Sequence, residues 1–87
     1  MKAKVYVTLK PSVLDPQGKA INHSVSSLGF AGISDVRQGK YFELTFDAET
    51  EYETARVAAE QIAKDVLANP VIEDFRIDFE EYLRNDD

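Results

Sequence analysis

Apolar and polar residues alternate at the beginning of the chain. Ala3, Val5, Val7 and Leu9 occupy odd-numbered positions, and polar residues or tyrosine separate them. A period of two residues is typical of a strand with one buried face. We therefore expect a first strand here that ends at Pro11, because proline has no backbone N–H to donate to a sheet.

The next apolar residues have helical spacing. Asp15-Pro16 combines a favoured N-cap with proline at the first helical position, so we expect a helix to begin there. Its apolar stripe, spaced at i, i+4 and i+7, consists of Ile21, Val25 and Leu28. Gly29 is a favoured residue just beyond a helix end, so the pattern predicts a helix of about 13 residues.

A third apolar segment is interrupted by a glycine. Its apolar residues, which share one parity, are Val36, Phe42, Leu44 and Phe46. Gly39 separates the first of them from the rest. Either one long strand is bent by a β-bulge at Gly39, or Gln38 and Gly39 form a tight hairpin turn that splits the strand in two. Of the two, we favour the bent or bulged strand.

The clearest helical pattern begins at Thr50-Glu51. Its apolar residues, at spacings of three and four, are Tyr52, Ala55, Ala59, Ile62 and Val66. Leu67-Ala68-Asn69-Pro70 should end this helix, because asparagine tolerates the left-handed conformation and proline cannot continue a helix. A last strand is then predicted by Val71, Phe75, Ile77 and Phe79.

The element order is β-α-β-α-β, in a single domain over residues 1–87. Because each helix has only one apolar stripe, the sequence predicts an α+β fold, a two-layer sandwich. We expect a small, largely antiparallel sheet, with its middle strand long, bent or split near Gly39, and both helices packed on one face. The other face would carry Tyr6, Tyr41 and Ile72, which are out of phase with the core, and would be a surface for a partner.

Chain length and cysteine content favour association with other chains. A domain of 87 residues buries only about 60–65% of the surface that its unfolded chain exposes. Such small domains commonly rely on disulfides, a metal or a partner subunit. The chain has no cysteine, which excludes disulfides, thiolate metal sites and a cysteine nucleophile. Oligomerisation is the support that remains.

Net charge argues against two classes of partner. Sixteen acidic and ten Lys or Arg residues give a formal charge of −6, which repels nucleic-acid phosphates and anionic lipids. We therefore expect no nucleic acid and no membrane partner. The chain shows neither the apolar segment of a signal peptide nor an apolar stretch long enough to span a bilayer, and we expect a cytoplasmic protein.

No residue in the sequence is a strong candidate for catalysis. His23 is the only histidine, and on a helix it would point away from the apolar stripe as a surface residue. Acidic pairs such as Glu51 and Glu53 suit the first turn of a helix, where the helix dipole favours negative charge. The segment Gly29–Gly32 matches neither of the glycine-rich patterns that bind phosphate groups, GxxxxGK[ST] and GxGxxG. We expect no catalytic residue, no metal ligand and no cofactor bound by this chain.

Two stretches are explained only in part by the fold: Leu9–Gly18 and Asp35–Lys40. Capping accounts for Asp15 and Pro16 but does not require Gly18, since glycine within a helix costs up to about 1 kcal/mol relative to alanine. Gly18 would instead let another backbone approach closely. Arg37 and Lys40 concentrate positive charge in an acidic chain, as either a solvated surface or a contact for an anionic partner.

These stretches carry a family resemblance that covers almost the whole chain. Four blocks occur in order: Val5–Val7 with Leu9–Pro11, then Val13–Gly18, then Asp35–Arg37 with Gly39-Lys40, and finally Leu67–Glu73. In these blocks the chain closely resembles the PurS family, the small subunit of phosphoribosylformylglycinamidine (FGAM) synthase, which acts in purine biosynthesis.

The resemblance implies a non-catalytic subunit of a three-part enzyme. In that enzyme a large, PurL-like synthetase subunit uses ATP and Mg, and a PurQ-like glutaminase subunit releases ammonia from glutamine. The PurS-like subunit would join them and support ammonia transfer, and it would also self-associate as a dimer or tetramer. The residues that we expect at these interfaces are Lys10, Pro11, Asp15, Pro16, Gln17, Gly18, Arg37, Gly39, Lys40, Asn69, Ile72 and Glu73.

Two other classes of function remain as alternatives, and the first has the same element order. A ferredoxin-like regulatory module would bind a small molecule such as an amino acid or nucleotide, which calorimetry would detect. A small lyase or isomerase would use one of the carboxylates, and the purified chain alone would then show turnover.

Overall fold

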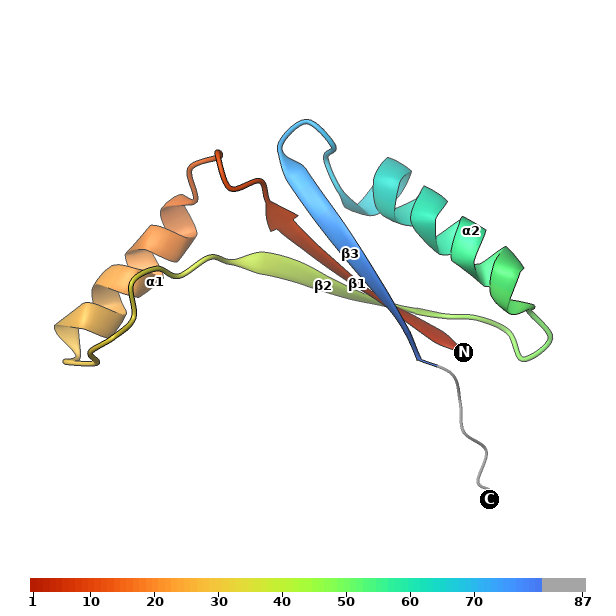
Figure 1. Cartoon of the computed structure of the whole chain (residues 1–87), viewed down its shortest axis with the longest axis horizontal. Helices are drawn as coiled ribbons and strands as arrows, with labels where there is room; N and C mark the ends of the chain where they lie inside the picture. The colour runs from red at the N-terminus through yellow and green to blue at the C-terminus, as the bar shows by residue number, and fades with distance from the viewer. Residues whose placement is uncertain (81–87) are drawn as a thin grey trace, which may run out of the picture.

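The computed structural model describes residues 1–80, and its strands and helices follow the expected order. The elements are β1 (Lys2–Leu9), α1 (Pro16–Ser27), β2 (Gly39–Thr45), α2 (Tyr52–Ile62), the π-helical turn η1 (Ala63–Leu67) and β3 (Glu73–Glu80). Figure 1 shows α2 lying along one side of the sheet, while α1 projects from one end. The α+β fold predicted from the sequence is confirmed.

Strand β1 lies in the centre of the sheet. The strand order is β2-β1-β3, and both neighbours run antiparallel to β1. Val5 of β1 pairs with Phe42 of β2 and with Ile77 of β3. The strand with the strictest alternation in the sequence is therefore the one that has partners on both edges.

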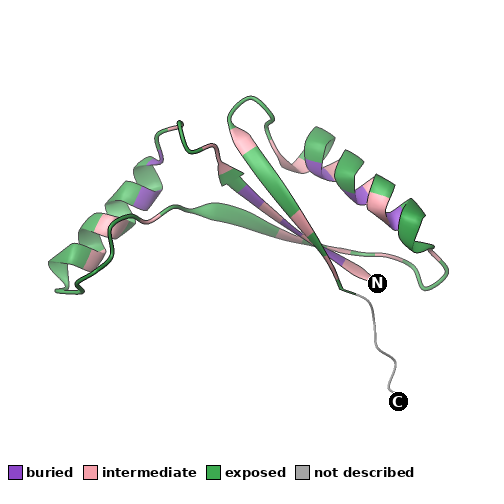
Figure 2. Ribbon diagram, in the orientation of Figure 1, coloured by how far each residue is buried: buried purple, intermediate pink, exposed green. Residues whose placement is uncertain are grey.

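The core forms between β1 and α2. Val5 and Val7 are fully buried, and Figure 2 shows buried positions along the central strand and on the inner side of α2. The buried helix positions are alanines: Ala55 and Ala59 in α2, and Ala63 at the start of η1. The distance between packed elements depends on the side chains at the contact, so this small-residue face lets the helix lie close to the sheet.

Helix α1 differs from the expectation that both helices pack on one face. It begins after the N-cap Asp15, and Gly18 is its only buried residue. Its apolar stripe is uncovered, with Ile21 at 42% and Leu28 at 76% exposure. The radius of gyration is 17.0 Å, whereas a compact chain of this length would have about 12 Å. Among residues 1–80, only the base of this helix is buried against the rest of the chain.

The middle strand is neither bulged nor split. Strand β2 begins at Gly39, opposite Thr8 near the end of β1, and residues 34–38 lead into it without belonging to a strand. Gln38, which would face Leu9 in the same register, donates its backbone N–H to the carboxylate of Asp15 instead, so β2 does not extend backwards as expected. A Cβ on Gly39 would lie 2.6 Å from the carbonyl oxygen of Val7, so glycine allows the close approach.

A turn at Asn69 makes the last strand begin later in the sequence than predicted. Its side-chain oxygen accepts a hydrogen bond from the N–H of Val71 at 3.0 Å. Its carbonyl oxygen accepts from the N–H groups of Ile72 and Glu73. The resulting turn holds Val71 and Ile72 outside the sheet, so β3 begins at Glu73 instead of Val71. Ile72 therefore does not lie on the outer sheet face as expected.

The predicted aromatic residues do lie on the face opposite α2. Val5 and Val7 point towards the helix, so Tyr6 between them points to the other side of the sheet. The rings of Tyr6 and Tyr41 are 5.1 Å apart, and the guanidinium of Arg76 lies 4.2 Å from the Tyr6 ring centre. Tyr41 also donates a 2.7 Å hydrogen bond to Glu43.

Candidate functional site

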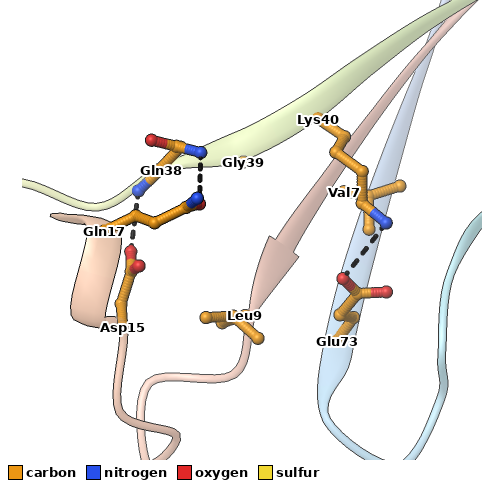
Figure 3. Close-up of a pocket in the computed structure, with 8 residues that line it drawn as sticks. All are labelled: Val7, Leu9, Asp15, Gln17, Gln38, Gly39, Lys40 and Glu73. Atoms are coloured by element: carbon orange, nitrogen blue, oxygen red, sulfur yellow. Dashed lines mark hydrogen bonds and ion pairs between the residues drawn. The ribbon is translucent and has the colours of Figure 1, made fainter.

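The residues predicted as an interface come together at one end of the sheet, where β1 ends and β2 and β3 begin. Three segments distant in the sequence meet there, residues 10–18, 35–40 and 69–74. The hollow between them has a volume of about 300 Å³. Figure 3 shows the polar side chains that line it, Asp15, Gln17, Gln38, Lys40 and Glu73. The residues selected separately along the sequence therefore belong to one local structure.

Asp15 connects two segments of this site. One oxygen of its carboxylate accepts a 3.0 Å hydrogen bond from the N–H of Gly18, which is the helix cap that the sequence predicts. The other accepts a 2.8 Å bond from the N–H of Gln38. The hydrogen bond from Gln38 makes the largest contribution to lowering the pKa of Asp15. The bond from Gly18 and the nearby positive charge of Arg37 lower it further, whereas burial raises it. The residue is 5% exposed.

Gly18 permits the close contact that its position in the first helical turn suggests. A Cβ at this position would lie 2.3 Å from the carbonyl oxygen of Val36 and 2.6 Å from a carboxylate oxygen of Asp15. Neither distance is compatible with a side chain. The expectation that a second backbone approaches Gly18 is confirmed, and the approaching backbone is the chain's own.

Arg37 binds backbone carbonyls of the segment before α1. Its Nη2 atom donates to the carbonyl oxygens of Lys10 at 3.0 Å and Val13 at 3.1 Å. Next to it, the side-chain amide of Gln38 donates a 2.6 Å bond to that of Gln17. The guanidinium is exposed, but it also stabilises the fold through these two hydrogen bonds. It is therefore not only the surface charge that the sequence suggests.

The two lysines of the site have acidic partners on the third segment. Lys40 lies 3.5 Å from Glu73, whose carboxylate also accepts a 2.7 Å bond from the N–H of Asn69. Lys10 pairs with Asp74 at 2.8 Å. The backbone N–H of Lys10 donates a hydrogen bond to the carbonyl oxygen of Ile72. These contacts fasten the turn before β3 to the ends of β1 and β2.

The remaining predicted residues lie in the same region. Pro11 is exposed in the segment after β1, and Pro16 occupies the first turn of α1. Sequence reasoning did not select Gln38 or Asp74. Their neighbours Gly39 and Glu73 were selected, but a backbone N–H that binds across 23 positions leaves no local pattern in the sequence.

The contacts within the site are hydrogen bonds and ion pairs. Within residues 1–80, no group of three or more His, Cys, Asp or Glu side chains is arranged to hold a metal ion. His23 is exposed on α1. What this arrangement can do physically is hold the base of α1 and the ends of three strands in a fixed relation.

Comparison with known proteins decides the family. The family model described as PurS, phosphoribosylformylglycinamidine (FGAM) synthase, matches residues 2–81. This chain belongs to the PurS family. A curated relative from Bacillus subtilis, the PurS subunit of phosphoribosylformylglycinamidine synthase, is 48% identical over 82 residues, which cover 94% of this chain and 95% of the relative.

Solved PurS structures share the fold. PurS of Methanocaldococcus jannaschii matches with a TM-score of 0.82 at 33% identity, over 94% of this chain and 98% of the other. A chain of the Thermotoga maritima structure described as PurLQS matches with a TM-score of 0.80 at 27% identity, over 88% and 93% of the two chains. A match covering 94% of the chain must include α1, so the similarity to PurS of Methanocaldococcus jannaschii extends over this helix.

Proposed function

We propose that this PurS protein is the non-catalytic small subunit of an FGAM synthase complex in de novo purine biosynthesis. It would bind a PurL-like synthetase subunit and a PurQ-like glutaminase subunit and hold their active sites in one assembly. The similarity to a chain of the structure described as PurLQS supports these two partners. The complex would use ATP, Mg and glutamine at the other subunits, with none bound by this chain.

A structural subunit has a chemical purpose in such an enzyme. Free ammonia is mostly protonated at neutral pH and is then not nucleophilic, so ammonia released at one active site must reach the other without equilibrating with bulk water. Holding the two sites in a closed assembly achieves this. We place this assembly in the cytoplasm. Within residues 1–80, no helix is long and apolar enough to cross a membrane.

The observation that carries the proposal is the uncovered helix α1. Ile21, Leu28 and, just after the helix, Phe30 are exposed large apolar residues. An exposed apolar patch on a small domain marks a surface for another protein. We infer that a second copy of the chain covers α1, giving a dimer or, by pairing of dimers, a tetramer. Closed two-fold assemblies are the commonest soluble homo-oligomers.

The end of the sheet is the second proposed contact surface. Gln17 and Lys40 line its hollow and are exposed, as is Ile72 in the turn before β3. Charged groups at the rim of an interface chiefly influence association rate and salt dependence. We propose that this surface meets the synthetase or glutaminase subunit, whereas Asp15, Gly18 and Arg37 maintain its shape.

Reconstitution tests the proposed function. The purified chain should hydrolyse neither glutamine nor ATP, and adding it to the other two subunits should restore glutamine-dependent FGAM formation. Ammonium supplied directly in place of glutamine provides the control, because it bypasses transfer between active sites. Glutamine hydrolysis by the isolated chain, or full glutamine-dependent synthesis without it, would contradict the proposal.

A further inference from the structure

Two segments of irregular backbone join α1 to the sheet. Residues 10–15 lead from β1 into the helix, and residues 28–38 lead from the helix back to β2. Few side chains along the helix itself set its direction, because Gly18, at the base, is its only buried residue, and Asn22 and Val25 are half-buried. Figure 1 shows the rest of the helix extending away from the sheet. Its angle must therefore be set where the two segments meet.

The hydrogen bonds that join the two segments are concentrated at that point. Asp15 accepts the 2.8 Å hydrogen bond from the N–H of Gln38 while it caps the helix through Gly18. Arg37 donates from the returning segment to two carbonyl oxygens of the outgoing one, at 3.0 and 3.1 Å. The side-chain amide of Gln38 also donates a 2.6 Å hydrogen bond to that of Gln17, in the first turn of α1. Hydrogen bonds with an ionised donor or acceptor, such as those of Asp15 and Arg37, are about twice as strong as neutral ones.

We propose that Asp15 and Arg37 are positioning residues, which hold α1 at a fixed angle to the sheet so that its apolar stripe is presented to a second copy of the chain. The part concerning the second copy rests on the self-association proposed above. A loosened helix adopts the binding direction for only part of the time. Because both copies in the dimer carry the loosened helix, the apparent dissociation constant rises by the inverse square of that fraction, so an occupancy of about one third gives about a tenfold rise.

Asp15→Asn separates this role from helix capping. Asparagine is as good an N-cap as aspartate, because its side-chain oxygen still accepts from the N–H of Gly18. Its other terminal atom is an amide nitrogen, which cannot accept the N–H of Gln38. Asp35→Asn is the matched control. It removes the same charge in the same region, but the carboxylate of Asp35 accepts a local hydrogen bond, from the N–H of Val36 at 2.9 Å, and does not join the two segments.

Distances between two spin labels measure the helix angle directly. The chain has no cysteine, so His23→Cys on α1 and Thr45→Cys at the end of β2 provide two unique labelling positions, both exposed. Labelled chain is mixed with an excess of unlabelled chain, so that only distances within one chain are detected by double electron–electron resonance. We expect a narrow distribution for the otherwise unmodified chain and for Asp35→Asn, and a broad one for Asp15→Asn.

A second variant and a second readout complete the test. Arg37→Gln removes the ties to the outgoing segment without touching the cap, and it too should broaden the distribution, with helix content by circular dichroism unchanged. Sedimentation should show the dissociation constant of both variants raised about tenfold. Narrow distributions in both variants would overturn the positioning role. A monomeric unmodified chain whose label distances still broaden on substitution would instead overturn self-association and leave the positioning role standing.

Discussion

The carboxylate of Asp15 accepts a 2.8 Å hydrogen bond from the backbone N–H of Gln38, a residue 23 positions further along the chain. The same carboxylate caps α1 through Gly18. One side chain therefore determines both where the helix begins and where the chain that returns from it must lie. Several properties of this PurS protein depend on that double role.

Gly18→Ala should destabilise the fold, although alanine is the better helix former. The added Cβ would lie 2.3 Å from the carbonyl oxygen of Val36, and forcing an extra methyl into such a contact costs about 1–3 kcal/mol. The gain in helix propensity offsets at most about 1 kcal/mol of this. A thermal melt followed by circular dichroism measures the effect, with exposed Lys19→Ala as the control. A melting temperature equal to or above that of the unmodified chain would contradict the packing described.

Leu28→Glu should weaken self-association and leave the stability of the protomer nearly unchanged. Leu28 is 76% exposed, and exposed substitutions usually alter stability by less than about 0.5 kcal/mol. Its apolar side chain would be buried against a second copy, where a charge is unfavourable. Val66→Glu is a matched control, because Val66 is 73% exposed but lies in η1. Sedimentation should show dissociation for Leu28→Glu alone, and equal dissociation by both variants would place the interface elsewhere.

Lys40→Glu should weaken assembly with the other subunits several-fold. Lys40 is 55% exposed and reaches over the hollow to Glu73 at 3.5 Å, so reversing its charge alters the surface offered to a partner more than the core. A titration of the reconstituted complex at low and high salt measures the change, because such charge contacts are screened. Lys19→Glu on α1 controls for net charge. Arg37 is less suitable for this test, since its substitution also frees two backbone carbonyls.

Tyr41 should ionise only in strongly alkaline solution. Its hydrogen bond to Glu43, followed by partial burial and by the nearby negative charge of Glu43, raises the pKa of Tyr41 to about 12 from 10.0. Because the folded state raises this pKa, its contribution to stability is complete below pH 10.0 and is lost as the pH rises through about 12. Glu43→Gln should lower the pKa of Tyr41, and ultraviolet titration with Tyr41→Phe as the reference measures the shift.

Local sequence patterns predicted most of the elements and the core face of β1. The alternation at Val5 and Val7 and the cap at Asp15 depend on neighbours in the chain, so they could be recognised without coordinates. The direction of α1 could not, because it depends on bonds from Gln38 and Arg37 to residues that are distant in sequence. For the same reason the blocks of the interface could be selected one by one, but their meeting at one hollow could not be foreseen.

The beginning of β2 was mispredicted for a related reason. Parity alone extended the strand through Gly39 towards Val36, whereas pairing with β1 stops at Gly39, opposite Thr8. The preceding residue, Gln38, donates its backbone N–H to Asp15 instead, and no local pattern in the sequence reveals that contact. The position of Gly39 was recognised as special, but its cause is the close approach of the carbonyl oxygen of Val7.

The π-helical turn after α2 acts as a single-residue insertion in an otherwise regular helix. The N–H of Ala68 bonds to the carbonyl oxygen of Ala63, five positions earlier. One residue more than an α-helical turn rotates everything that follows by about 100° around the axis. This explains why Val66, the expected end of the apolar stripe, is 73% exposed, while Leu67 packs against the core. Deleting one residue from η1 would restore the α-helical phase and bring Val66 inward. This one extra residue therefore determines which side chains after α2 face the core.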